Sequence, residues 1–139
     1  MNNSVMDAVI SSITSVMEIM FFVAVEPKDA PENLSAVFDA NTLRTSTIKF
    51  SGPYSGIIYL AVPQNVLENM TLNFMGEGED ALTQEHTDGT LKEALNMVAG
   101  SAMTQLSKEA AMGLGIPELS DSGLFFKGTG GILLDTGDG

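Results

Sequence analysis

The residues best suited to chemistry in this chain are Glu93 and Asn96, which stand three positions apart in the segment Thr90–Met112. The segment reads TLKEALNMVAGSAMTQLSKEAAM, and its apolar residues recur at the spacing of an α-helix. Side chains three positions apart are neighbours on a helix, so the two polar groups share one face. A carboxylate and a carboxamide on an open helix face can bind a partner or act on it.

The face that bears this pair is otherwise made of small residues. Gly100, Ser107 and Ala111 leave little side chain to obstruct an approaching molecule. Glycine inside a helix costs roughly 1 kcal/mol relative to alanine, which favours a functional reason for Gly100, although tight packing against another element is the structural alternative. We therefore take Gly100 and Met97 as candidate partner-binding residues beside the candidate catalytic pair.

Helices and strands must position that pair, and the sequence predicts them in a definite order. An apolar stripe predicts a first long helix near the N-terminus, and β-branched and aromatic runs predict strands. Pro63 suits the first turn of a short helix that ends near Gly76. The prediction is an α/β (α+β) fold, with a mainly antiparallel sheet packed against two long helices. The predicted first helix is Asn2–Phe22, and the predicted strands are Ser35–Asp39, Thr45–Phe50, Ser55–Val62, Leu124–Lys127 and Gly131–Asp135.

The other segments are predicted to be loops, caps and turns. Glu26–Asn33 contains two prolines, and Glu77–Thr87 is acidic and polar, so both have loop composition, and the second includes His86. Asp88 or Thr90 can cap the long helix that follows. The predicted hairpin turns are Ser51–Gly56 and Gly128–Gly130, and the predicted edge segment is Ile116–Leu119, where Pro117 is tolerated.

The two halves of the chain also resemble each other weakly. Ile48–Val62 and Leu124–Thr136 both read as strand, glycine turn and strand, each downstream of an amphipathic helix. If this pseudo-repeat is real, Ile10 of the first helix stands where the second has Asn96. Only the second helix then bears the polar pair, although β-hairpins often look alike.

Composition excludes several classes of function. The chain has 139 residues, enough for a single domain over 1–139, and a formal net charge of −12, which argues against nucleic acid and anionic membranes as partners. There are no cysteines and one histidine, so cysteine sites and histidine metal sites are not expected. Glycines 128, 130 and 131 lack the Lys-Ser/Thr of a phosphate loop. The acidic residues lack EF-hand spacing, so a solvated loop is predicted instead for Glu77, Glu79, Asp80 and Glu85.

The segment Glu93–Ala102, EALNMVAGSA, resembles the E-x-x-N motif of the CheC/CheX/FliY phosphatases, and the order of the other elements is similar to that family along nearly the whole chain. Pro117 resembles the proline that opens the strand after the motif helix. One motif copy, with Ile10 in the first helix, is more similar to CheX than to CheC, which has two. Two features depart from the pattern: Gly89 stands where the family often has Asp or Ser, and Pro117 lies slightly closer to Asn96.

The resemblance implies a phosphatase that hydrolyses the aspartyl-phosphate of a CheY-like response regulator. Such an acyl phosphate is already activated, so the enzyme has only to place a water in line with phosphorus. A carboxamide donates and accepts hydrogen bonds, so Asn96 would orient that water, while Glu93 would pair with the regulator's active-site lysine. The Mg²⁺ would belong to the regulator, and no cofactor is expected in this chain. The resemblance also implies a homodimer that associates through its sheets. Near the N-terminus, the apolar part of Val16–Val25 is interrupted by Glu18, is too short to span a bilayer and follows no basic residue, so a cytoplasmic protein is predicted.

Other interpretations of the pair stay open at this point. An isolated E-x-x-N on a helix is most often a solvated face, although similarity over the whole chain favours function. A non-catalytic module that docks a response regulator or a flagellar-switch component would use the same helix. A purely structural dimer unit predicts instead that Glu93 and Asn96 are buried in a self-interface. The closing residues Thr136–Gly139 have turn chemistry, which predicts that one more strand follows in the natural protein.

Overall fold

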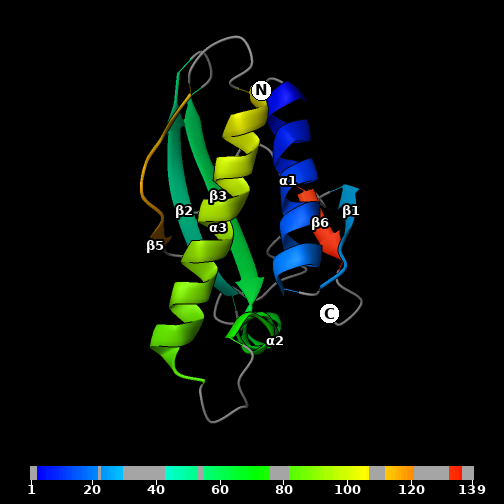
Figure 1. The fold of residues 1–139 in the computed structure, drawn as a ribbon, viewed down its shortest axis with the longest axis vertical. Coiled ribbons are helices and arrows are strands. Elements are labelled where there is room, and N and C mark those ends of the chain that lie inside the picture. Colours follow the sequence, from blue (N-terminus) through cyan, green and yellow to red (C-terminus); the bar gives the residue numbers. More distant parts are fainter. Residues whose placement is uncertain are drawn as a thin grey trace.

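The computed structural model describes residues 3–21, 23–29, 43–52, 55–75, 82–106, 112–120 and 132–135. In these ranges an antiparallel sheet lies behind the helix α3, and the helix α1 lies beside α3 (Figure 1). The elements are α1 (Asn3–Phe21), β1 (Glu26–Asp29), β2 (Leu43–Ser51), β3 (Gly56–Pro63), α2 (Gln64–Met75), α3 (Gln84–Leu106), β4 (Gly113–Leu114), β5 (Glu118–Ser120) and β6 (Ile132–Asp135). The predicted fold class is confirmed, with a third, shorter helix α2 beside the two long ones.

The strand β2 is the centre of the main sheet. It pairs antiparallel with β3 along its whole length, from Leu43 opposite Pro63 to Phe50 opposite Gly56. Its other edge is shared by two short strands, β4 near Phe50 and β5 near Ser46. The predicted hairpin is therefore confirmed. Gly52 in its turn has a φ of 133°, a backbone conformation that residues other than glycine rarely adopt.

The helix α3 packs on this sheet through its apolar face. Leu95 and Ala99 are fully buried against Ile48 of β2, with Ile58 and Leu60 of β3 packed around them. A fully buried leucine or isoleucine contributes about 1.5–3 kcal/mol to stability, so this contact fixes which side of α3 faces the sheet. The opposite side of α3 is left to solvent.

A second core joins the three helices. The ring centroids of Phe21 in α1 and Phe74 in α2 lie 5.2 Å apart, and the Asn73 side-chain amide donates to the Phe21 carbonyl at the end of α1. The C-terminal ends of α1 and α2 are thereby joined. The buried members of this cluster are Ile13, Met17, Phe21, Val62, Val66, Leu67, Met70, Leu91, Ala94 and Val98.

Several predicted boundaries and roles of the long helix were wrong. It begins at Gln84, because the Thr83 hydroxyl accepts a hydrogen bond from the His86 amide and so caps the helix. His86 therefore lies in the first turn and not in a loop. Asp88 and Thr90 lie inside the helix instead of capping it, and the Thr90 hydroxyl donates to the His86 carbonyl. At the other end, Met112 is outside the helix and directly precedes β4.

The segment Glu26–Asp29, predicted as part of a loop, is the strand β1. It pairs antiparallel with β6, from Glu26 opposite Asp135 to Asp29 opposite Ile132. The two prolines and four charged residues of EPKDAPEN do not have a strand pattern, because this strand gains its regularity from a partner about a hundred residues away. Pro63 was predicted to open α2 but is the last residue of β3. The predicted strands Ser35–Asp39 and Leu124–Lys127 and the acidic residues Glu77, Glu79 and Asp80 lie outside the described residues.

Candidate functional site

The helix α3 places Glu93 and Asn96 on the face that is turned away from the sheet. Both residues are exposed, whereas Ala94, Leu95, Val98 and Ala99 around them are at most 1% exposed. The two side chains therefore share one exposed face, as predicted, and the helix that bears them is firmly packed. Neither side chain contributes to the core.

Glycines flank the pair on the same side of the helix. Gly89 lies four positions before Glu93, and Gly100 lies four positions after Asn96, so each is one turn away on the exposed face. A Cβ atom added to either glycine would meet no atom within 4 Å. Tight packing therefore does not explain Gly100, and the surface around the pair is open on both sides.

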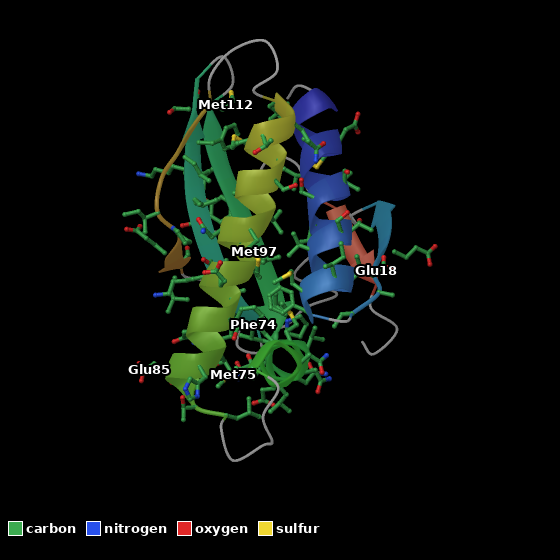
Figure 2. The ribbon with its side chains drawn as sticks, in the orientation of Figure 1. Glu18, Phe74, Met75, Glu85, Met97 and Met112 are labelled. Atoms are coloured by element: carbon green, nitrogen blue, oxygen red, sulfur yellow. The ribbon has the colours of Figure 1, made fainter. Side chains whose placement is uncertain are left out.

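Met97 lies on the flank of this face that is turned toward α1. It is half-buried and packs against the helical core cluster (Figure 2). The seam between the two helices also contains a polar contact: the Ser12 hydroxyl, 1% exposed, donates to the Ser101 hydroxyl at 3.0 Å and accepts from the Gln105 amide at 3.1 Å. Met97 therefore belongs partly to the core and partly to the candidate binding surface.

The first half of α3 is tied to the sheet by an ion pair that the sequence did not predict. The Arg44 guanidinium on β2 contacts the Asp88 carboxylate at 2.6 Å. The only sequence signal was one arginine at the start of a predicted strand in an acidic chain, which does not identify its partner. Asp88 stands five residues before Glu93, so the Arg44–Asp88 ion pair helps to position Glu93 and Asn96 relative to the sheet.

Exposed carboxylates dominate the electrostatics near the pair. Glu85 at the start of α3 and Glu93 are both exposed, whereas Arg44 is neutralised by Asp88. Lys92 is half-buried on the opposite flank of α3 from Met97. A partner of this surface should therefore bring basic groups.

Glu93 and Asn96 lie apart from the cavity that the described residues form. Among the described residues, a cavity of about 290 Å³ lies at the start of α3, between Arg44, Glu68 and Thr83, and neither Glu93 nor Asn96 lines it. The exposed pair lies on a convex helix instead. Such a surface can enter the site of another macromolecule but cannot enclose a small substrate.

No helix in the described part of the chain is both long enough and apolar enough to cross a membrane. In the same residues, no three acidic or histidine side chains come together in a way that could hold a metal ion.

Comparison with solved structures finds the same fold in chemotaxis proteins. CheX in the CheX–CheY–BeF₃–Mg²⁺ complex of Borrelia burgdorferi superposes with a TM-score of 0.68 at 15% identity, over 96% of this chain and 90% of that one. CheX of Vibrio vulnificus gives 0.67 at 17% identity, over 93% and 78%. A CheC-like protein of Shewanella sp. PV-4 gives 0.66 at 20% identity, over 96% and 82%.

Sequence comparison identifies the family. None of the curated proteins compared with the chain matches it. The family described as "Chemotaxis phosphatase CheX" matches residues 44–125, which is more than half of the chain and runs from the start of β2 past β5. This range contains Glu93, Met97 and Gly100 as well as Asn96, and the fold agrees with it. The chain therefore belongs to the CheX family.

Proposed function

We propose that this protein is a phosphatase that hydrolyses the aspartyl-phosphate of a CheY-like response regulator in chemotaxis or two-component signalling. Membership of the CheX family supports a role connected with CheY-like proteins, and one similar CheX is seen in complex with CheY. The proposal assigns the catalytic role to Glu93 and Asn96. It places the protein in the cytoplasm, where the response regulator would be.

The exposure of Glu93 and Asn96 on a convex, firmly packed helix is the observation that supports this function best. An aspartyl-phosphate in a receiver domain lies in a recess on another protein, so the catalyst has to project outward. Gly89 and Gly100 leave the surface low on both sides of the pair, so a partner can approach the helix closely. A small-molecule enzyme would need the reverse shape, a recess in its own surface.

In the proposed mechanism, Asn96 acts on the water and Glu93 acts on the partner. The Asn96 carboxamide accepts a hydrogen bond from the attacking water and holds it in line with the phosphorus–oxygen bond that breaks. Glu93 forms a charge-assisted hydrogen bond with a lysine of the regulator and fixes the docked geometry. Water adds to phosphorus, the aspartate leaves as a carboxylate, and inorganic phosphate is released.

The regulator would supply the metal ion in this scheme. The phosphoryl group transferred to water needs charge neutralisation, which Mg²⁺ bound beside the phosphorylated aspartate provides. The proposal therefore assigns no metal ligands to this chain. Its own groups contribute orientation, which can be worth several kcal/mol of barrier lowering when a water is held in an attacking position.

The decay of ³²P-labelled phospho-regulator, with and without this protein, tests the proposed function. Faster decay that scales with the concentration of the protein is the expected result. Binding of the phospho-regulator without faster decay would refute the phosphatase and establish the non-catalytic docking module instead. Chelation of Mg²⁺ should abolish the stimulated decay if the metal belongs to the regulator.

We also propose that the protein forms a homodimer through its sheet. Among the described strands, β3 is at an edge, with β2 on one side and no partner on the other. Unpaired strand edges favour association with a second strand. Light scattering during size-exclusion chromatography should give twice the chain mass of 14.7 kDa, and a monomer mass would contradict the dimer.

A further inference from the structure

Three large apolar side chains are exposed where the helices meet. Ile19 and Met20 at the end of α1 are 68% and 39% exposed, and Phe74 at the end of α2 is 40% exposed. The Phe21–Phe74 ring contact and the Asn73–Phe21 hydrogen bond hold these two helix ends together. We call Ile19, Met20 and Phe74 the apolar ridge. Exposed apolar groups gathered in this way mark interaction surfaces more often than isolated ones do.

The ridge lies at the level of the Glu93–Asn96 pair. The helices α1 and α3 run antiparallel (Figure 1), and the Ser12–Ser101 hydrogen bond fixes their register. Ile19 is about two turns, or about 10 Å, beyond Ser12 on the same face of α1. The matching level on α3 is about two turns before Ser101, which is the level of Glu93, and Met97 lies one turn further along.

Phe74 approaches the same place from the third helix. Figure 2 shows Phe74 and Met75 at the end of α2, between the lower parts of α3 and α1, with Met97 above them on α3. Met70, one turn before Phe74, belongs to the same core cluster as Ala94 and Val98 of α3. The ridge and the half-buried Met97 therefore form an apolar surface next to the catalytic pair.

The charges around this surface determine what it fits. Glu93 borders the surface on α3, and its carboxylate is exposed. Specific protein interfaces commonly have an apolar centre and a polar rim. A complementary partner presents apolar side chains next to a lysine or arginine that can pair with Glu93.

We propose that the apolar ridge is the docking surface for the receiver domain of the response regulator, and that it supplies binding energy while Glu93 and Asn96 act on the phosphoryl group. This inference rests on the proposed function for the identity of the partner. It separates two tasks on neighbouring surfaces: α1 and α2 provide affinity, and α3 provides the chemistry.

The test uses the Ile19→Ser variant of the full chain and a CheY-like regulator from the same organism, loaded with Mg²⁺ and beryllofluoride. Ile19 is so exposed that the substitution should leave the fold unchanged. We expect Kd to rise about tenfold, the effect of losing one well-placed apolar anchor. In the decay assay KM should rise similarly while kcat at saturating phospho-regulator stays the same.

Ile116→Ser is the matched control. Ile116 is 83% exposed and stands between β4 and β5 in the chain. The strand β5 lies on the far side of α3 from α1 (Figure 1). The Ile116→Ser substitution removes the same kind of side chain from a similarly exposed position, so Kd should stay at the wild-type value. Equal Kd values for Ile19→Ser and the wild type, or equal losses in both variants, would overturn the ridge as the docking surface.

The outcomes also separate this inference from the proposed phosphatase. If the wild type binds through Ile19 but does not accelerate decay, the phosphatase fails and the docking surface stands. If decay is accelerated and Ile19→Ser leaves KM unchanged, only the docking surface fails. Absence of any binding between the wild type and the loaded regulator overturns the docking surface.

Discussion

The Arg44 guanidinium lies 2.6 Å from the Asp88 carboxylate and joins the central strand β2 to the first half of α3. The two side chains are 34% and 17% exposed, so the ion pair is partly protected from solvent and salt. Leu95 and Ala99 anchor α3 further along through apolar contacts with Ile48. Glu93 and Asn96 lie between these attachments, which explains how an exposed pair can have a defined position.

Replacing Arg44 with alanine should lower the free energy of unfolding by about 1–2 kcal/mol, because the partly buried Asp88 loses its partner. Urea unfolding followed by circular dichroism measures this change. Lys49→Ala on the same strand is the control: Lys49 is exposed, so the change should stay within about 0.5 kcal/mol. Equal stability of Arg44→Ala and the wild type would show that the ion pair does not hold α3.

Replacing Asn96 with alanine should lower stimulated dephosphorylation by about 100-fold or more, since the water loses the group that orients it. The side chain is exposed, so the unfolding transition should not move. Thr104→Ala, an exposed position two turns further along α3, is the matched control and should keep wild-type activity. Full activity of Asn96→Ala would exclude the proposed role of the carboxamide.

Glu93→Gln separates charge from shape at the other half of the pair. The substitution keeps the size of the side chain but removes the charge that would attract the regulator's lysine. We expect KM for phospho-regulator to rise about tenfold, as for loss of one charge-assisted hydrogen bond, and its dependence on salt to weaken. An unchanged KM at low ionic strength would contradict the assigned contact.

The sequence predicted those features that have a local physical signal. The 3.6-residue apolar period identified α1 and the body of α3, and the β-branched run with a glycine turn identified β2 and β3. It also placed Glu93 and Asn96 outward, because their positions follow directly from the buried face of α3. Helix ends were less predictable: Thr83 caps α3 seven residues before Thr90, inside a stretch with loop composition.

Features that depend on distant partners could not be predicted in the same way. The strand β1 owes its regularity to β6, and its proline and charged residues give no strand pattern of their own. Arg44 and Asp88 are 44 positions apart, and neither residue type identifies the other. The apolar ridge could not be predicted for a related reason: Met20 fits the apolar stripe of α1, but at the end of the helix it is 39% exposed, and Ile19 beside it is 68% exposed.

The glycines beside Glu93 and Asn96 give a prediction with two opposite effects. An added Cβ at Gly89 or Gly100 meets no atom within 4 Å, so Gly89→Ala and Gly100→Ala should each raise the free energy of unfolding, by up to about 1 kcal/mol. A variant with a larger side chain at position 100 should also fold. Gly100→Gln should be at least as stable as the wild type, because glutamine too is a better helix former than glycine.

If the regulator approaches this face closely, however, Gly100→Gln should weaken its binding several-fold through steric conflict. Calorimetric titration of the beryllofluoride-loaded regulator measures the affinity, and thermal unfolding of the same samples measures the stability. A Gly100→Gln variant that is stable and binds with wild-type affinity would show that the open face around Gly100 is not part of the interface.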